Sequence, residues 1–406
     1  MMKENFSVSL SEVEKARSLI NPHIRRTELD LSPSATKKLG KDIYFKFENE
    51  QLTGSFKIRG ALNRILNLSS EEKARGVVAS SAGNHAQGVA LSAQKASVRC
   101  TIVMPKTAAL IKVEATRSYG AEVVLYGEAY DDAFDKAQEL ERQYGFTFVH
   151  PYQDPHVIAG QGSLGLEMLE QCPDFDTLIV PVGGGGLISG ISLAVKALRP
   201  QVRIIGVQSN QAPGMVQLFY GQELKLPPRV STIADGIAIK RPSRFMAENF
   251  LRKYVDQMVT VDDDEIAEAI VFLMERAKSV TEGSGAAGFA AALAGKIPLG
   301  NKNLVLLCGG NIDLNMVAKI IQKGQIRRKR LAEISVIVSD LPGSLYQLTK
   351  ILAERGANVL EVHHDRVSHR LALRETRIDF VIETINQEHL EEIRQALKQL
   401  SIELVN

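Results

Sequence analysis

The chain has 406 residues, of which 45% are hydrophobic and 24% charged, so it can fill the cores of two or three globular domains. Its 49 Lys and Arg residues nearly balance its 47 Asp and Glu residues, which leaves no global positive field to attract nucleic acid. The most apolar runs are far shorter than the roughly 20 residues that a membrane span needs. We therefore expect neither a nucleic-acid nor a membrane partner.

The cysteines Cys100, Cys172 and Cys308 are widely spaced and form no C-x-x-C motif. This spacing argues against a disulfide framework and a structural zinc site, and it favours a reducing compartment. The first residues contain no apolar segment of the kind found in secretory signals. Together these features predict a cytoplasmic protein.

The predicted elements begin with a helix to about Leu19, opened by Ser11 and Glu14, which have capping-box spacing. Alternating apolar and polar residues then predict a strand at 42–48. Further along, short apolar runs alternate with helical stretches. The predicted strands are 76–80, 100–104, 122–126, 177–182, 202–207, 259–261 and 304–308, and the predicted helices are 85–95, 109–119, 130–144, 187–198 and 263–278. This alternation predicts an α/β fold with a parallel sheet covered on both faces.

The composition changes at 323–330, which holds five basic residues and no acidic one, whereas 332–406 holds twelve acidic and eight basic residues. A basic run can bind nucleic acid, but a solvated linker at 323–331 is the simpler interpretation. The tail predicts strands at 333–339, 358–365 and 374–384, helices at 344–355 and 389–400, and a last short strand. This βαββαβ order is typical of a ferredoxin-like domain.

Lys57 is the first candidate for chemistry. It lies between Phe56 and Ile58, shortly after a Gly-Ser pair that predicts a turn. Apolar neighbours desolvate an ammonium group, which lowers its pKa and frees the amine as a nucleophile or base. An unremarkable loop lysine would give the same local pattern.

The segment 80–88 follows a predicted strand and opens a predicted helix with small residues. Exposed backbone N–H groups at a helix N-terminus can hold a carboxylate, and the Asn84 amide can donate as well. An ordinary N-cap asparagine is the alternative. His85 by itself is better explained as a structural residue.

Four glycines, 183–186, stand between a predicted strand and a predicted helix. Such a run is entropically costly, and it suits backbone that wraps an anion at a helix start. The run does not satisfy G-x-G-x-x-G, and no Gly-Lys-Ser/Thr follows it, so a single phosphate group fits better than a dinucleotide or a P-loop nucleotide.

Two glycine-rich element ends, around Glu282 and Cys308, complete the set. Cys308 ends a predicted strand, where open α/β sheets bind ligands, although a buried structural cysteine is the default. A lysine, a helix start with asparagine and a phosphate cradle together indicate a Schiff-base cofactor with a phosphate tail. That combination predicts pyridoxal 5'-phosphate.

The motifs SFKIRGA, SSAGNHAQG and PVGGGGLISG, with the strand at Cys308, resemble those of the pyridoxal-phosphate-dependent threonine/serine dehydratases, the threonine ammonia-lyases. The resemblance covers about 5–325 and implies the two-lobed tryptophan-synthase-β-like fold (fold type II). Residues 332–406 resemble an ACT domain. We therefore expect a catalytic domain at 1–322 with a smaller lobe at about 42–150, a linker at 323–331 and a regulatory domain at 332–406. One departure is Thr27-Glu28-Leu29, where the family usually has Thr-Pro-Leu.

The resemblance also implies residue roles. Lys57 would hold the cofactor and act as the catalytic base, and Asn84 would bond the ring's 3'-oxygen. The other implied cofactor-binding residues are Phe56, Gly183, Gly184, Gly185, Gly186, Leu187, Glu282 and Cys308, with Cys308 facing the pyridine nitrogen. The implied substrate-binding residues are Ser81, Ala82, Gly83, Asn84 and His85. Asp235 and nearby carbonyls could hold a cation, but an ordinary polar loop is simpler, so we predict no metal site.

The resemblance implies deamination of L-threonine to 2-oxobutanoate and ammonia through β-elimination of water, and also of L-serine to pyruvate, in a dimer or tetramer regulated by isoleucine or valine at the ACT domain. Ala82 stands where related serine racemases have a serine, which predicts little racemase activity. A β-replacement enzyme such as a cysteine synthase is the first alternative. A catalytically dead amino-acid-binding regulator is the second.

Overall fold

The computed structural model describes residues 6–227, 230–367, 371–400 and 402–405. Its contacts divide the chain into a first unit, Met1–Ile312, and a second unit, Asp313–Asn406.

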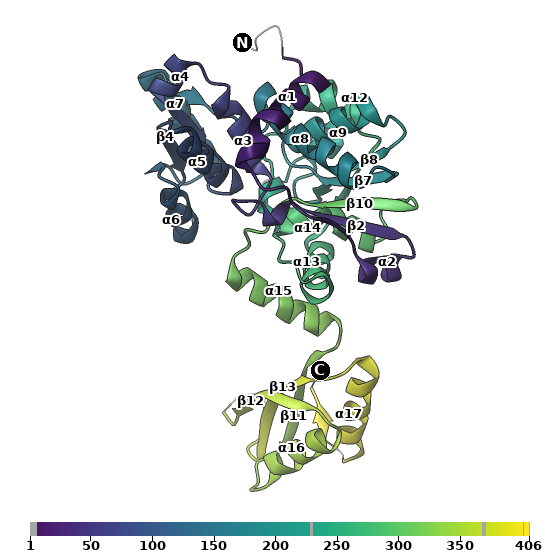
Figure 1. The fold of residues 1–406 in the computed structure, drawn as a ribbon. Coiled ribbons are helices and arrows are strands. Elements are labelled where there is room, and N and C mark those ends of the chain that lie inside the picture. Colours follow the sequence, from purple (N-terminus) through teal and green to yellow (C-terminus); the bar gives the residue numbers. More distant parts are fainter. Residues whose placement is uncertain (1–5, 228–229, 368–370, 401, 406) are drawn as a thin grey trace. The chain divides into compact units, whose positions relative to one another are not determined.

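A six-stranded sheet with the order β1-β2-β10-β7-β8-β9 supports the larger lobe of the first unit (Figure 1). β1 pairs antiparallel with β2, and the other neighbours pair in parallel. The strands are Leu29–Leu31 (β1), Asp42–Phe47 (β2), Thr177–Pro181 (β7), Arg203–Ser209 (β8), Gln257–Val261 (β9) and Lys302–Leu307 (β10). Our prediction that the smaller lobe starts at about residue 42 is wrong, because β2 pairs with β10 in the larger sheet.

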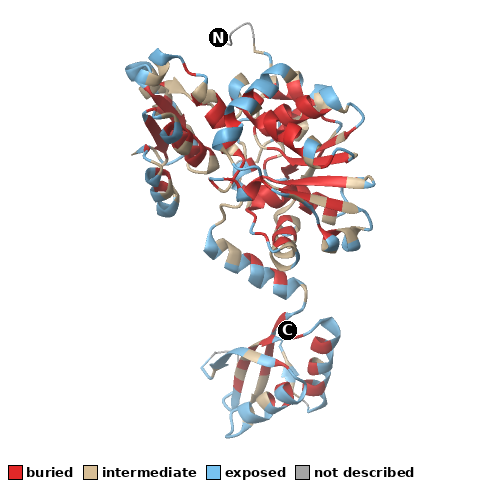
Figure 2. Cartoon of the chain, viewed as in Figure 1, coloured by how far each residue is buried: buried red, intermediate tan, exposed pale blue. Residues whose placement is uncertain are grey.

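The central strand β7 is buried on both faces, as a parallel sheet between helices requires (Figure 2). Leu178 and Val180 share an apolar cluster with Ile188 of α9. Ile179 points to the other face, where a Cβ on Gly288 of α14 would lie 3.3 Å from its side chain. The covering helices are α8 (Pro155–Gln171) and α9 (Gly186–Leu198) on one face, and α13 (Asp263–Phe272) and α14 (Gly283–Leu293) on the other.

The smaller lobe contains a four-stranded parallel sheet with the order β5-β4-β3-β6. Its strands are Val77–Ser80 (β3), Cys100–Met104 (β4), Glu122–Leu125 (β5) and Thr147–Phe148 (β6). Ala79 and Ile102 pack against α5, whereas Val78 and Val103 pack against α7. The helices of this lobe are α5 (Asn84–Ala96), α6 (Leu110–Ser118) and α7 (Tyr130–Tyr144).

Several helices differ from the sequence prediction. α1 (Leu10–Ile20) begins two residues earlier than expected, since Ser9 caps it and the Glu12 carboxylate accepts from the Ser9 N–H at 2.7 Å. Ser9 with Glu12 and Ser11 with Glu14 have the same capping-box spacing, and the structure uses the first pair where the sequence prediction used the second. α3 (Lys57–Leu66), α8 and α14 were not predicted. The other helical segments are α2 (Pro33–Leu39), α4 (Ser70–Arg75), α10 (Gly214–Phe219), α11 (Arg244–Met246), α12 (Arg252–Tyr254), the π-helices η4 (Ala247–Leu251) and η5 (Leu273–Ala277), and the 3-10 turns η1 (Asn21–His23), η2 (Glu48–Glu50) and η3 (Asp235–Ile237).

Glycines bring α3, α8 and α9 into close contact. A Cβ on Gly160 of α8 would lie 2.5 Å from the Arg59 carbonyl oxygen and 2.7 Å from the Gly60 Cα of α3. A Cβ on Gly190 of α9 would lie 2.2 Å from the Ile158 carbonyl oxygen of α8. Such distances leave no room for a methyl group, so these glycines allow backbone-to-backbone packing.

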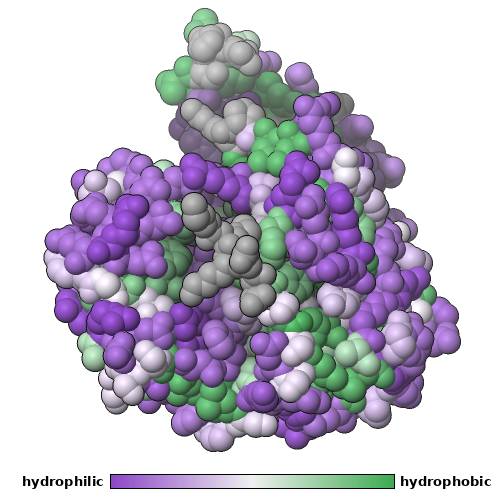
Figure 3. Space-filling model, turned by 90° about the horizontal axis from the view of Figure 1, so that it is seen from above, coloured by the Kyte–Doolittle hydropathy of each residue, from purple (hydrophilic) through white to green (hydrophobic). Residues whose placement is uncertain are grey.

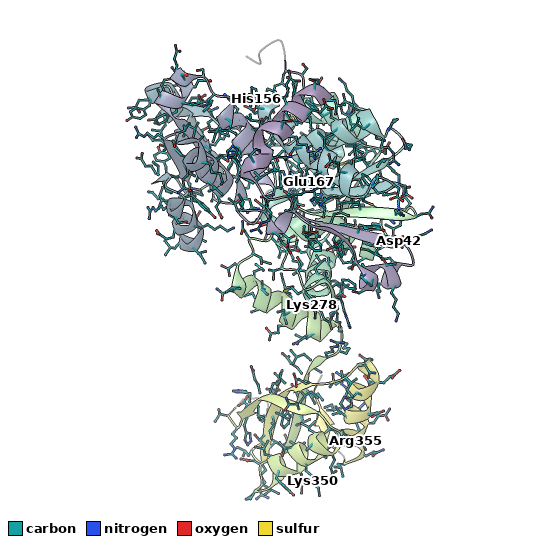
Figure 4. The ribbon with its side chains drawn as sticks, in the orientation of Figure 1. Asp42, His156, Glu167, Lys278, Lys350 and Arg355 are labelled. Atoms are coloured by element: carbon teal, nitrogen blue, oxygen red, sulfur yellow. The ribbon has the colours of Figure 1, made fainter. Side chains whose placement is uncertain are left out.

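Four buried ionisable side chains join α3 to β2 and α8. The Arg59 guanidinium bonds the Glu48 carboxylate at 2.7 Å and the Glu167 carboxylate at 3.0 Å, and Lys46 Nζ bonds Glu167 at 2.6 Å. None of these side chains is more than 4% exposed, and Figure 4 marks Glu167 in the packed interior. Burial opposes the charge of each group, but Arg59 and Lys46 hold the pKa of Glu48 below its usual value. The network therefore depends on every partner being present.

The second unit begins with α15 (Leu314–Arg327), followed by an antiparallel sheet with the order β12-β13-β11-β14. Two helices pack their apolar residues on this sheet. The elements are β11 (Leu331–Ser339), α16 (Ser344–Glu354), β12 (Asn358–Asp365), β13 (Glu375–Glu383), α17 (Gln387–Gln399) and β14 (Glu403–Leu404). The predicted βαββαβ order is confirmed. The predicted linker is not extended at its start, because 323–327 form the last residues of α15.

In the described part of the chain, none of the helices combines the length and the apolar character that crossing a membrane demands. The face seen in Figure 3 is mainly hydrophilic, with hydrophobic residues in separate patches.

We predict that Arg59→Met destabilises the first unit by about 3–5 kcal/mol, because it leaves two buried carboxylates with Lys46 alone. Urea unfolding followed by circular dichroism would measure this change. Arg117→Met is the control, since the Arg117–Glu114 pair is exposed, and its effect should stay below about 1 kcal/mol. Equal effects of the two substitutions would contradict the prediction.

Candidate active site

A cavity of about 700 Å³ lies between the two lobes of the first unit. Its lining includes the carboxyl ends of parallel strands, where α/β proteins commonly bind ligands. Every site residue predicted from the sequence lines it: Phe56, Lys57, Ser81, Ala82, Gly83, Asn84, His85, Gly183, Gly184, Gly185, Gly186, Leu187, Glu282 and Cys308. Five separate stretches of the chain therefore meet in one place: 56–57, 81–85, 183–187, Glu282 and Cys308.

Lys57 is the first residue of α3 and not a loop residue. Its Nζ donates to the Pro151 carbonyl oxygen at 3.1 Å and lies 5.1 Å from the centre of the Phe56 ring. Burial lowers the pKa of Lys57 to about 8, although Cys308 and Glu282 act in the opposite direction. The unprotonated amine is therefore the minor form at pH 7, but it is far more populated than in an ordinary lysine.

Asn84 opens α5, and its side-chain amide is held at both ends. Its Nδ2 donates to Glu282 Oε1 at 2.8 Å, and its Oδ1 accepts from Asn311 Nδ2 at 2.8 Å. Burial, reinforced by the charge of Asp235, raises the pKa of Glu282 to about 8. Glu282 is thus largely protonated at neutral pH.

The glycine run forms a loop against Tyr152 at the start of α9. A Cβ on Gly184 would lie 2.3 Å from the Tyr152 ring, and one on Gly186 would lie 2.8 Å from the Tyr152 Cα. Gly185 has φ +92°, a conformation that side chains disfavour. The first N–H groups of a helix have no partner within that helix, so this loop offers donors to an anion.

Cys308 follows β10 and is buried. Its Sγ lies 3.7 Å from the Ser284 carbonyl oxygen, and burial raises the pKa of the thiol, which stays protonated. The Ser284 hydroxyl is also buried, lines the cavity and has no protein hydrogen-bond partner among the described residues. A polar group left in this way is suited to a ligand that enters the cavity.

The start of α5, Gly83–His85, lines the cavity. His85 Nε2 lies 2.8 Å from the Val149 carbonyl oxygen, so the ring donates there. Burial lowers the pKa of His85 to about 3, and the ring is neutral. The side chain therefore anchors the helix start, as expected for a structural histidine.

Sequence reasoning missed several cavity residues. Tyr152 and His150 follow β6 with no motif to mark them, whereas Asn311 stood in the glycine-rich segment after Cys308 without a role. Burial lowers the pKa of His150 to about 4, and its Nδ1 accepts from the Gln153 N–H at 2.8 Å. Asp235 pairs with Lys112 of the other lobe at 3.2 Å.

Comparison with known proteins gives the family. The family model described as pyridoxal-phosphate dependent enzyme matches residues 20–309, more than half of the chain. The chain belongs to the pyridoxal-phosphate-dependent enzyme family. The ACT domain model matches residues 332–401.

Three relatives illustrate the range of this family. The L-threonine ammonia-lyase of Thermotoga maritima is 46% identical over 390 residues, covering 96% of this chain and 97% of that protein. The catabolic L-threonine dehydratase of Staphylococcus aureus is 47% identical over 322 residues, covering 78% of this chain and 93% of its own. The structure of maize serine racemase has a TM-score of 0.72 at 34% identity, covering 80% of this chain and 100% of that one.

Pyridoxal 5'-phosphate is the cofactor of this family, and the cavity fits it on structural grounds. The buried Lys57 amine suits the cofactor's carbonyl carbon, and the glycine loop is a cradle that Cβ atoms would fill. The unpartnered Ser284 hydroxyl and the held Asn84 amide add donors around the ring. The residues present therefore match a phosphate, an aldehyde and a polar aromatic ring.

The pKa of Lys57 gives a testable pH dependence. Below pH 8 the amine is mainly protonated and cannot attack a carbonyl, so the rate at which cofactor-free protein links to added pyridoxal phosphate should rise with pH and level off above about 8. Stopped-flow absorbance would record it. Nα-acetyl-lysine, whose single amine has a pKa of about 10.4, is the comparison. A protein rate that keeps climbing with that of Nα-acetyl-lysine would contradict the prediction.

Proposed function

We propose that this protein deaminates L-threonine to 2-oxobutanoate and ammonia, and L-serine to pyruvate and ammonia. The observation that carries the proposal is the 46% identity with the Thermotoga L-threonine ammonia-lyase over almost the whole of both chains. The cavity supports it, because an amine base and anion-binding backbone lie together there.

When bound, pyridoxal phosphate supplies an electron-withdrawing ring that weakens the bonds at the substrate Cα. We assign Lys57 as the residue that holds the cofactor and, as a neutral amine, takes the Cα proton. The Cβ–OH bond then breaks and water leaves. Water later adds at the former Cα, and ammonia is released, so the reaction needs no oxidant.

The other assignments concern binding. In our proposal, N–H groups of the glycine loop and Leu187 hold the phosphate, and Asn84 donates to the ring's 3'-oxygen. Backbone at 81–85 holds the substrate carboxylate. The protonated Cys308 thiol faces the pyridine nitrogen and cannot stabilise positive charge there, which favours elimination over transamination. Ala82 carries no proton to deliver to the opposite face, which argues against racemisation.

We further propose that 1–322 is the catalytic part and 332–406 the regulatory part, with isoleucine or valine as the effector. The resemblance to ACT domains implies that 332–406 binds an amino acid. The second unit, which contains these residues, has its own apolar core. A homodimer or homotetramer in the cytoplasm, serving isoleucine biosynthesis, completes the proposal.

An assay for 2-oxo acids tests the activity. With L-threonine the purified protein should form 2-oxobutanoate, and Lys57→Ala should lower kcat by at least about a thousandfold because the base is lost. Lys278→Ala, an exposed lysine, is the control and should keep full activity. Formation of D-serine from L-serine, or full activity of Lys57→Ala, would contradict the assignments.

Deleting 332–406 tests the regulatory assignment. The truncated protein should keep threonine deamination but lose any response to isoleucine, because the proposed effector domain is gone. The Staphylococcus relative, which matches over 322 residues covering 93% of its length, indicates that such a shorter chain can exist. Rates with and without isoleucine would be compared for both proteins. An isoleucine effect of equal size in the truncated protein would refute this assignment.

A further inference from the structure

The side-chain amide of Asn84 can face the cavity in two ways. Its oxygen and nitrogen are almost equal in size, so rotation by 180° exchanges a donor for an acceptor at nearly the same place. Only the surrounding hydrogen bonds decide which end is presented. A donor stabilises an ionised ring oxygen, whereas an acceptor stabilises a protonated one.

Glu282 cannot decide the orientation by itself. Its Oε1 accepts from Asn84 Nδ2 at 2.8 Å, but burial keeps this carboxyl protonated near neutral pH, so it could also donate to a rotated Asn84. A protonated carboxyl is both donor and acceptor.

Asn311 is different, because its own orientation is fixed by the backbone. Its Nδ2 donates to the Thr53 carbonyl oxygen at 2.7 Å, and a carbonyl oxygen can only accept. The same Nδ2 donates to Asn84 Oδ1 at 2.8 Å. A rotated Asn84 would put two donors against each other, so Asn311 selects the orientation in which Asn84 Nδ2 lies on Glu282, which lines the cavity.

The backbone around Asn311 is built for this contact. Gly54 has φ +68°, and a Cβ there would lie 2.4 Å from Asn311 Oδ1. The Gly310 N–H donates to the Gly54 carbonyl oxygen at 2.9 Å, which ties the two loops together. The Asn311 amide thus sits in a space that only a glycine leaves open.

We infer that Asn311 is a positioning residue that makes Asn84 a hydrogen-bond donor to the cofactor's ring oxygen. This inference rests on the proposed function, because the contact between Asn84 and that oxygen belongs to the proposal. Asn311 acts through Asn84, by holding the amide acceptor away from the cavity.

The absorbance of the purified holoprotein tests the inference without any turnover. Bound cofactor absorbs at long wavelength when the ring oxygen is ionised and at short wavelength when that oxygen carries the proton. Asn311→Leu removes the two hydrogen bonds that Nδ2 donates and keeps a side chain of similar size. It should shift the ratio of the two bands about fivefold toward short wavelength, as expected when one hydrogen bond to the Asn84 oxygen is lost. Asn311→Asp should shift the band ratio in the same direction, and it is the variant to measure if Asn311→Leu does not fold.

Asn303→Leu is the matched control. Asn303 is a buried asparagine whose Nδ2 also donates to backbone carbonyls, here two of them, at the opposite end of β10. Its replacement should lower stability and leave the band ratio unchanged. A shift as large as that of Asn311→Leu would mean that loosened packing causes the effect, and it would overturn the inference.

Asn84→Ala separates the inference from the proposal beneath it. If Asn84→Ala shifts the ratio and Asn311→Leu adds nothing in that background, the two residues act in series as inferred. If Asn84→Ala shifts the ratio but single Asn311 variants do not, the inference fails and the role of Asn84 stands. If neither substitution shifts it, both assignments fail.

Discussion

Close helix packing at glycines is the constraint on which this active site depends. α3 carries Lys57, and it can lie against α8 because Gly60 and Gly160 have no side chains there. α8 in turn touches α9, which begins at the glycine loop, through Gly162 and Gly190. Each added methyl would push backbones apart by more than the tolerance of a catalytic contact. The distance between lysine and phosphate cradle is thus set by packing beneath the site.

The buried ion network reinforces the same crossing. Arg59 lies two residues after Lys57 and bonds carboxylates from η2 and α8. Apolar residues could have filled this space, and they would have been at least as stable. Charged partners add a directional requirement, because Arg59 meets both carboxylates in one placement of α3. The network therefore fixes the placement of α3 against α8, at a helix crossing where the glycines have no side chains to interlock.

Exclusion of water sets the protonation of the side chains that line the cavity. Glu282 and Cys308 are buried and Lys57 is partly buried, and the loss of water shifts the pKa of each group in the direction that favours its neutral form. A neutral amine can act as a base, a protonated glutamate can accept a hydrogen bond from the Asn84 amide, and a protonated thiol carries no negative charge into the cavity. One physical effect thus prepares three groups for elimination chemistry.

Local sequence by itself determined most strands of the two sheets of the first unit, the βαββαβ order of the second unit and the motifs that line the cavity, because these depend on short-range periodicity and glycine placement. It did not reveal the short edge strands β1 and β6. It failed for β2, whose lobe depends on pairing with β10, more than 250 residues away. It also failed for α3, where α5 and α8 decide that Lys57 opens a helix. Only the tertiary structure brought Asn311 to Asn84 and Tyr152 to the glycines, since such contacts join distant residues that leave no mark on their own neighbours.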